Sequence, residues 1–172
     1  MVPREVHSKE LFKHITLPAN YYPPIIVAFD LKTPENIGNI MRLADNIACE
    51  KLLLVTSGNE NRISKIRRTA ASSFDAIAWE YCNASELNQK IPKSYTWVAI
   101  ETSSDSENIY KAVLPEKVAF IVGNEISGID HNILNKCKKI VHIPVYGKNT
   151  SLNVSHALAV VLFEWQKRII GL

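Results

Sequence analysis

The chain has 172 residues, of which 47% are hydrophobic and 22% are charged, and its formal net charge is +3 at pH 7. A chain of this length buries roughly two thirds of its unfolded surface in one core, so one globular domain is expected. The small positive charge does not by itself identify a nucleic-acid partner, because that inference needs a cluster of basic residues.

The cysteines and histidines argue against a disulfide framework and a metal site. Cys49, Cys82 and Cys137 are odd in number, far apart and without a C-x-x-C pair. The HExxH motif is absent, and no metal-ligand spacing relates the five histidines, His7, His14, His131, His142 and His156. No segment resembles a signal peptide or reaches the roughly 18 apolar residues of a membrane helix. We therefore expect a soluble, cytoplasmic protein without a metal or a membrane anchor.

Apolar, β-branched runs alternate with helical patterns along most of the chain. An N-terminal helix or arm at 1–24 is expected to precede a single domain at 25–172. In chain order, the patterns predict a strand at 25–31, a helix at 34–49, a strand at 51–57, a basic helical segment at 61–70, a strand at 76–81, a helix at 84–91, strands at 95–102 and 117–123, a helix at 131–137, a strand at 139–145 and a helix at 151–170. Nearly continuous Val, Ile and Ala in the strands predicts an α/β domain with a mostly parallel sheet covered by helices.

In an open parallel sheet, ligands bind beyond the carboxyl ends of the strands. The segment DLKTPENIGNIMR (30–42) follows the first strand, with Pro34 at a helix start and Asn36, Gly38 and Arg42 within the first two turns. Arginine presents a planar fork of donors that suits phosphate. An ordinary helix start, with Asn36 as a cap and Arg42 in solvent, explains the same residues.

The segment FIVGNEISGID (120–130) runs from a strand into Gly123, Glu125 and Gly128. Glycines at a strand end permit positive φ and a close approach of the backbone to a ligand. The spacing of the glycines is similar to that of a phosphate-binding loop, but the required Lys and Ser/Thr are missing. The GxGxxG fingerprint is also absent, so neither a nucleotide hydrolase nor a classical dinucleotide site is supported.

The segment IPVYGKNTSLNVS (143–155) joins the last strand to the last helix. Ser151 could be an ordinary helix N-cap. Asn153 and Ser155, however, add further polar groups to the start of a helix that is otherwise strongly apolar. This helix is apolar around more of its circumference than packing on one sheet face requires, which predicts that a partner subunit covers it.

Together, the three segments resemble the three motifs of the SpoU, or TrmH-like, branch of the SPOUT RNA 2′-O-ribose methyltransferases. NIGNIMR (36–42) resembles the first motif, IVGNEISGI (121–129) the second and IPVYGKNTSLNVSHA (143–157) the third, in matching order and spacing from about Ile25 onward. The resemblance implies a C-terminal deep trefoil knot and a homodimer with active sites at the subunit interface. It also implies S-adenosyl-L-methionine as the methyl donor and RNA as the substrate.

By the same resemblance, the donor would be held mainly by backbone groups and one strand end, at Gly123, Ile143, Leu152, Ile100, Glu101 and Thr102. The catalytic positions of the family fall on Asn36, Arg42, Glu125, Ser151 and Asn153. A guanidinium is effectively always protonated, so we expect Arg42 to hold an RNA phosphate and polarise the ribose hydroxyl rather than act as a base. Asn36 would orient Arg42 or the ribose, while Glu125 and Asn153 would fix the loop geometry and the orientation of Arg42.

Four basic residues lie within seven positions that contain no acid: Arg62, Lys65, Arg67 and Arg68. Arg62, Lys65 and Arg68 are three apart and project from one helix face. A solvated surface helix accounts for this pattern, but beside the three motifs the pattern predicts a track for RNA phosphates.

The motifs specify the chemistry and say little about the RNA. The substrate could be ribosomal or transfer RNA, and the segment RRTAASSFDAI (67–77) favours transfer RNA. A non-catalytic RNA-binding or dimerisation module that kept the fold is the alternative. The intact motif residues, Arg42 and Glu125 among them, argue against that alternative.

Overall fold

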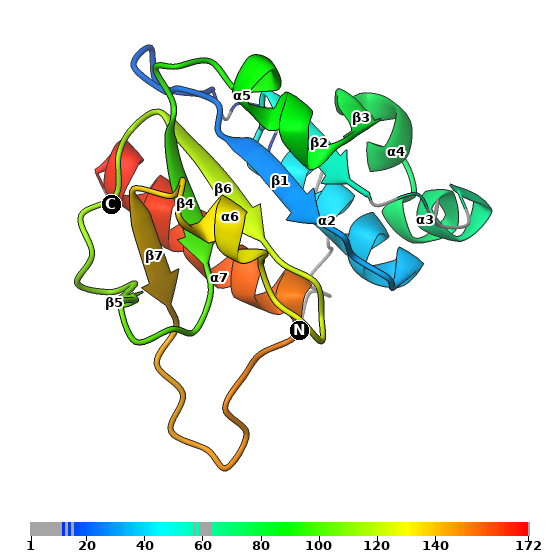
Figure 1. Cartoon of the computed structure of the whole chain (residues 1–172). Helices are drawn as coiled ribbons and strands as arrows, with labels where there is room; N and C mark the ends of the chain where they lie inside the picture. Colours follow the sequence, from blue (N-terminus) through cyan, green and yellow to red (C-terminus); the bar gives the residue numbers. More distant parts are fainter. Residues whose placement is uncertain (1–11, 13, 15, 57, 59–62, 172) are drawn as a thin grey trace, which may run out of the picture.

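The structure is a computed structural model of the whole chain, and it describes every residue except 1–11, 13, 15, 57, 59–62 and 172. Seven strands form one sheet in the order β3-β2-β1-β6-β4-β7-β5, and every ladder between them is parallel. The strands are β1 (Ile25–Phe29), β2 (Lys51–Val55), β3 (Trp79–Cys82), β4 (Thr96–Ile100), β5 (Glu107–Asn108), β6 (Val118–Val122) and β7 (Lys139–His142). The expected parallel α/β architecture is confirmed (Figure 1).

The central strands are buried on both faces. In β1, Ile26 and Ala28 belong to a core on one side of the sheet, and Ile25 and Val27 belong to a core on the other side. All four residues are at most 1% exposed. Burial on both faces explains why these strands read as continuous apolar runs rather than as an alternating pattern.

Helices cover both faces of the sheet (Figure 1). The larger core contains apolar residues of the two longest helices, and the smaller core contains residues of two short helices on the opposite face. These pairs are α2 (Pro34–Asn46) with α7 (Val154–Ile170), and α5 (Leu87–Lys90) with α6 (His131–Leu134). No helix among the described residues is long and apolar enough to cross a membrane.

Gly38 lets helix α3 (Ile63–Ala70) approach α2 closely. A Cβ atom at Gly38 would lie 2.5 Å from Cβ of Thr69 and 3.0 Å from the backbone nitrogen of Ala70. A glycine is therefore required for this packing. This contact holds the first motif against the basic helix. After α3, the chain passes through the short helix α4 (Ser73–Ala76) and enters β3.

Most expected elements are present, but several are shorter. The first strand ends at Phe29 because Asp30 has a φ of 50°, which breaks the extended backbone. The helix expected over 84–91 is instead a 3₁₀ turn, η1 (Ala84–Glu86), followed by α5. The last helix starts at Val154 and not at Ser151, since the side chain of Asn153 accepts the cap hydrogen bond. The short elements α4 and β5 have no counterpart among the expected elements.

The last turns of α7 are bound to the connection between β5 and β6. Trp165 Nε1 donates to the carbonyl of Pro115 at 2.9 Å. Arg168 donates from Nη2 to the carbonyl of Ile109 at 2.8 Å, and from Nη1 to the carbonyl of Ala112. Ile109 and Ala112 are at most 1% exposed, so these carbonyls have little access to water.

Replacing Arg168 with alanine should destabilise the fold. Loss of the guanidinium leaves two buried carbonyls without these donors, which costs about 1–3 kcal/mol of unfolding free energy. Denaturant unfolding measures the change. The neighbouring Lys167 is exposed, and Lys167→Ala should change stability by less than about 0.5 kcal/mol. Equal stabilities for the two variants would show that the Arg168 hydrogen bonds do not hold this connection.

Candidate functional site

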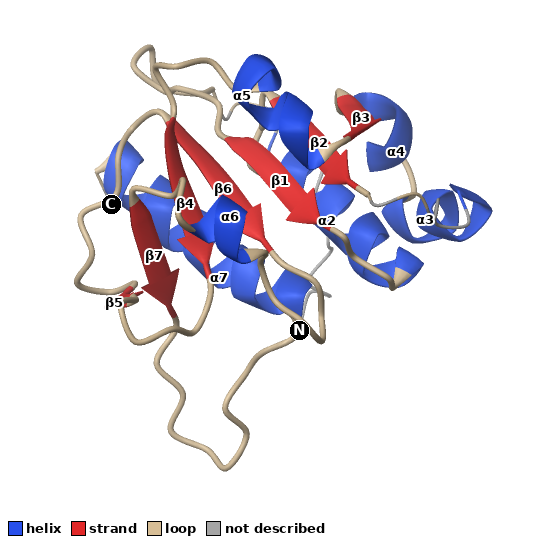
Figure 2. Cartoon of the chain, viewed as in Figure 1, coloured by secondary structure: helices blue, strands red, loops and turns tan. Residues whose placement is uncertain are grey.

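A cavity of about 460 Å³ lies at the carboxyl ends of β4, β6 and β7. Its walls come from three connections at that end of the sheet, 101–106, 123–130 and 143–153, of which the third is a long loop (Figure 2). Small-molecule sites in proteins typically enclose about 300–1,000 Å³. The position also agrees with the rule that open parallel sheets bind ligands beyond the ends of their strands.

The structure brings together all six residues expected to hold the donor, because each lines this cavity: Ile100, Glu101, Thr102, Gly123, Ile143 and Leu152. Three residues expected to be catalytic, Glu125, Ser151 and Asn153, line it as well. Asn36 lies behind the wall and is bonded to two of them, whereas Arg42 is elsewhere. The roles of these residues stay predictions, but their convergence is observed.

A chain of hydrogen bonds joins the three motifs, and we call its members, Glu125, Asn36, Asn153 and Ser155, the polar bridge. Asn36 Nδ2 donates to Glu125 Oε1 at 2.8 Å, and Asn153 Nδ2 donates to Asn36 Oδ1 at 3.0 Å. Asn153 Oδ1 accepts from the backbone nitrogen and the hydroxyl of Ser155 at 2.9 and 2.7 Å. Asn36 is only 6% exposed, so its amide depends on these partners.

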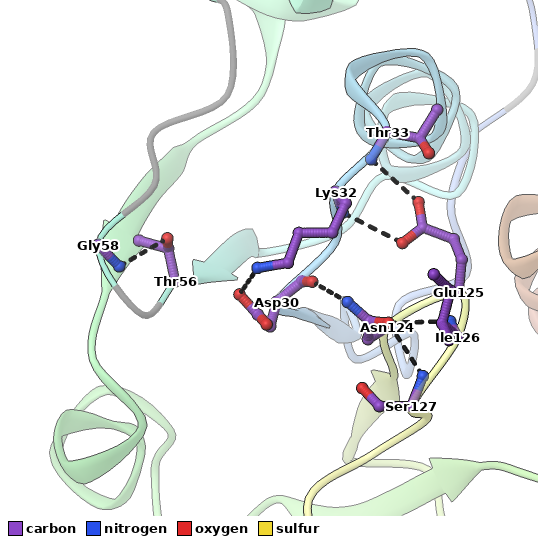
Figure 3. Close-up of polar contacts among 9 residues, drawn as sticks. All are labelled: Asp30, Lys32, Thr33, Thr56, Gly58, Asn124, Glu125, Ile126 and Ser127. Carbon is purple, nitrogen blue, oxygen red and sulfur yellow. Dashed lines mark hydrogen bonds and ion pairs between the residues drawn. The ribbon is translucent and has the colours of Figure 1, made fainter.

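Glu125 also caps the start of α2. Its carboxylate accepts hydrogen bonds from the backbone nitrogens of Lys32 and Thr33, both at 3.1 Å (Figure 3). Thr33 occupies the N-cap position but makes no side-chain cap bond of its own. Partial burial of Glu125 raises its pKa, but the donors from Asn36, Lys32 and Thr33 outweigh it and hold the pKa below the usual value. The carboxylate is therefore ionised at neutral pH.

Asn124 holds the second motif in a tight turn. Its Oδ1 accepts from the backbone nitrogens of Ile126 and Ser127 at 2.8 and 3.0 Å, and its Nδ2 donates to the carbonyl of Asp30 at 2.7 Å (Figure 3). Asn124 and Gly128 exchange two backbone hydrogen bonds of 3.0 Å. The sequence signal for this role is slight, because Asn124 is marked out only by its place between Gly123 and Glu125.

Gly123 and Glu101 allow two walls of the cavity to meet. A Cβ atom at Gly123 would lie 2.3 Å from the carbonyl carbon of Gly128 and 2.5 Å from the nitrogen of Ile129. Glu101 accepts from the nitrogens of Ile129 and Thr102 at 3.1 and 3.0 Å, which ties the end of β4 to the turn after β6. The expected close approach at Gly123 was to a ligand, whereas the close contact in the structure is with the backbone of Gly128 and Ile129.

The third wall is open to a ligand. Within the part of the chain that the structure describes, residues 143–152 form no hydrogen bond. The described residues that line the cavity include two carboxylates, Glu101 and Glu125, and neither a lysine nor an arginine. The cavity therefore offers free backbone groups and a negative electrostatic environment.

Arg42 lines a second hollow of about 250 Å³ between α2 and α7. Asn36, Glu125 and Asn153 bind one another, and within the described residues no hydrogen bond joins them to Arg42. Their expected effect on the orientation of Arg42 therefore stays a prediction. Six residues turn an α-helix through about 600°, so Arg42 emerges about 120° away from Asn36 around α2. Helical geometry therefore separates the arginine from the cavity of its own chain.

The basic segment forms α3, with Arg62 outside the described residues. Arg67 donates to Asp75 at 2.8 Å and lies 4.1 Å above the ring of Phe74, so it helps to pack α4. Lys65 and Arg68 lie three positions apart on the helix and keep the predicted spacing. A role for Arg67 in binding RNA would have to compete with these contacts.

Gly128, named in the sequence with Gly123, lines the cavity as well. Nine further lining residues had not been singled out in the sequence: Val122, Asn124, Ile126, Val141, His142, Val145, Thr150, Val154 and Ala157. Most of them flank the motif residues, so proximity in sequence is the available signal. His142 Nδ1 lies 2.9 Å from the hydroxyl of Ser106. Among the described residues, no group of three or more His, Cys, Asp and Glu could hold a metal ion.

Comparison with known proteins identifies the class. A family model described as the SpoU rRNA Methylase family matches residues 23–163. The match spans most of the chain, and the chain belongs to this family. The family assignment made from the three motifs is confirmed.

Two curated relatives are 23S rRNA (guanosine-2′-O-)-methyltransferases named RlmB. The protein from Blochmanniella floridana is 25% identical over 166 residues, which are 95% of this chain and 65% of that protein. The protein from Neisseria meningitidis serogroup B is 24% identical over 167 residues, which are 95% of this chain and 64% of that protein. The chain thus spans less than two thirds of the length of these relatives.

Solved structures show the same fold. An AdoMet-bound rRNA methyltransferase from Sinorhizobium meliloti has a TM-score of 0.78 at 21% identity, over 86% of this chain and 57% of that chain. A structure described as giving insights into the 2-OH methylation of C/U34 on tRNA has a TM-score of 0.77 at 22% identity, over 87% of this chain and 97% of that chain.

Gly123→Ala should disrupt the turn after β6. The added methyl group meets backbone atoms that cannot move independently, so we expect a loss of about 1–3 kcal/mol of unfolding free energy. Gly147 is the matched control, because nothing lies within 4 Å of a Cβ atom there. Thermal or denaturant unfolding of both variants provides the comparison. A Gly123→Ala protein as stable as Gly147→Ala would contradict the close contact.

Glu125→Gln should change how stability depends on pH. Because the folded pKa of Glu125 is lowered, the carboxylate stabilises the fold fully above the unfolded pKa of about 4.3 and loses this effect as pH falls through the folded pKa. The difference in unfolding free energy between wild type and Glu125→Gln should be constant from about pH 6 to pH 8. It should shrink as the pH falls below about 4.3. A difference that grows in acid would contradict the lowered pKa of Glu125 in the folded protein. Glu116→Gln, at an exposed position, should change stability by less than about 0.5 kcal/mol at pH 7.

Proposed function

We propose that the chain transfers a methyl group from S-adenosyl-L-methionine to a ribose 2′-hydroxyl of RNA. The observation that carries this proposal is the cavity at which the loops of the second and third motifs meet, in a chain of the SpoU rRNA Methylase family. The names of the curated relatives support a guanosine ribose in 23S rRNA as the acceptor.

The residues of the cavity suit this methyl donor. Its sulfonium is a cation, and the described residues that line the cavity include Glu101 and Glu125 and neither a lysine nor an arginine. The free backbone groups of residues 143–152 are available to the polar edges of the adenine and the amino acid. Gly123, Ile143 and Leu152 would hold the donor, which supplies an electrophilic methyl group when bound.

Arg42 would hold a phosphate of the acceptor RNA. Its fork of donors matches phosphate geometry, and it is exposed in the hollow between α2 and α7. Once the ribose is fixed against the donor, positioning supplies much of the rate. Lys65 and Arg68 on α3 would extend the phosphate contacts, so binding should weaken steeply with salt.

A homodimer would bring the hollow of one copy to the cavity of the other. Arg42 does not reach the cavity of its own chain, and a second copy resolves that separation. Phe163 on α7 and Leu152 at the cavity rim are 47% and 44% exposed, which supports an apolar interface near both sites. Residues 25–172 would then form one catalytic domain per subunit.

A C-terminal trefoil knot is part of the same proposal. The connection between β5 and β6 lies against α7 and is bonded to it by Trp165 and Arg168. These contacts support a chain end that is held within an earlier loop. Such a topology would keep the third motif pressed against the end of β7.

Arg42→Ala should lower methyl transfer about 100-fold or more, because the acceptor loses its phosphate anchor and its alignment. The affinity for S-adenosyl-L-methionine, measured by calorimetry, should stay unchanged since Arg42 lies outside the cavity. Lys167→Ala, at the far end of α7, is the control. Wild-type methylation by a folded Arg42→Ala protein would remove Arg42 from the mechanism.

The acceptor RNA can be identified by mapping 2′-O-methyl groups in ribosomal and transfer RNA from cells with and without the protein. The names of the curated relatives lead us to expect one guanosine site in 23S rRNA, and they give no support to the preference for transfer RNA drawn from residues 67–77. Loss of a methylated site from transfer RNA alone would instead favour transfer RNA as the substrate. Transfer RNA is the RNA named in the description of the solved structure of which this chain covers 97%. Unchanged maps in both RNAs would contradict the proposed function.

A further inference from the structure

The hollow that contains Arg42 also contains a histidine. From α2, the hollow is lined by Asn39, Arg42, Leu43 and Asn46, and from α7 by Ser155, His156 and Ala159. The α2 residues follow the spacing of one helix face. Of all these lining residues, Arg42 and His156 alone are charged or titratable. Any group that Arg42 holds in the hollow therefore lies beside an imidazole.

The polar bridge fixes the two helices that carry these side chains. Asn153 caps α7 and is bonded to Asn36 on α2 at 3.0 Å, and Ser155, next to His156, is 4% exposed. The first turn of α7 separates the two sites. Val154 and Ala157 face the cavity, whereas Ser155 and His156 face the hollow. The histidine is thus held in the hollow beside Arg42, and the proposed homodimer would bring this hollow to the cavity of the second copy.

The proposed reaction needs a proton acceptor that Arg42 cannot provide, because a guanidinium is always protonated. The carboxylates of the cavity are already engaged, with three hydrogen bonds to Glu125 and two to Glu101. His142 is likewise bonded to Ser106. In the described part of the chain, no hydrogen bond or ion pair involves the side chain of His156. A neutral imidazole accepts a proton readily near neutral pH.

We propose that His156 accepts the proton of the ribose 2′-hydroxyl, an inference that rests on the proposed methyl transfer. The hydroxyl oxygen bonds to the methyl carbon as the carbon–sulfur bond breaks, and its proton passes to an imidazole nitrogen of His156. The sulfur takes the bonding pair and leaves as a neutral thioether, and the imidazolium then releases the proton to water. The RNA phosphate held by Arg42 stabilises the imidazolium while it exists.

Substitution of His156 separates proton transfer from binding. His156→Ala should lower kcat about 100-fold, the usual effect of losing a general base. The affinity for S-adenosyl-L-methionine should not change, and added imidazole should restore part of the rate by entering the hollow. His156→Gln can donate and accept hydrogen bonds but cannot take up the proton, so its rate should be equally low. Lys167→Ala is the control on the same helix. A wild-type rate in either His156 variant would overturn the proposal.

The pH profile and RNA binding give independent tests. In wild type, kcat should rise with pH as the general base loses its proton, and both His156 variants should lose this rise. The probe for binding is the RNA fragment identified by the methylation map, with ribose or 2′-deoxyribose at the target. Wild type should prefer ribose about fivefold, as one hydrogen bond would give, and His156→Ala should show no preference. Retention of the pH dependence or of the preference would contradict the role of His156. Absence of methylation by wild type would instead refute the proposed function.

Discussion

The amide of Asn36 is the constraint on which the rest of the site depends. It is buried, donates to Glu125 and accepts from Asn153, and so it joins its own segment to two others that are 89 and 117 positions away. Burying an amide without hydrogen-bond partners costs about 1–3 kcal/mol. The packing of Asn36 therefore favours the arrangement in which both Glu125 and Asn153 are in place. Two members of the bridge also organise a helix start, because Glu125 caps α2 and Asn153 caps α7. The two helices and the turn after β6 are thereby held as one unit.

This unit places two sites of opposite character on either side of the first turn of α7. Among the described residues, those that line the cavity include two carboxylates and no lysine or arginine, whereas those that line the hollow include Arg42 and no acid. A cationic methyl donor suits the first site and an anionic RNA backbone suits the second. The proposed reaction needs the cavity and the hollow together. Because Arg42 does not reach the cavity of its own chain, we propose that two chains form each active site. His156 lies in the hollow with Arg42, which the second copy would place against its own cavity.

Much of this architecture follows from local sequence. Apolar runs such as 25–31 define buried parallel strands, and Gly123 marks a close backbone approach, because both signals depend on near neighbours in the chain. The position of Arg42 could not be predicted from local sequence. The six residues from Asn36 to Arg42 place the two side chains about 120° apart around α2, and their order in the motif does not reveal this separation. The cap of α7 is another case, because Ser151 and Asn153 are both good N-cap residues and the distant bond to Asn36 favours Asn153. Partners more than 80 positions away lie beyond any periodic pattern.

The proposed methyl transfer depends most directly on the cavity being a site for S-adenosyl-L-methionine. Titration of the purified chain with this compound by isothermal calorimetry tests that claim without needing the RNA to be known. We expect saturable binding with one site per chain, and competition by the demethylated thioether product. A folded chain that shows no heat of binding, and no thermal stabilisation by the same compound, would contradict it.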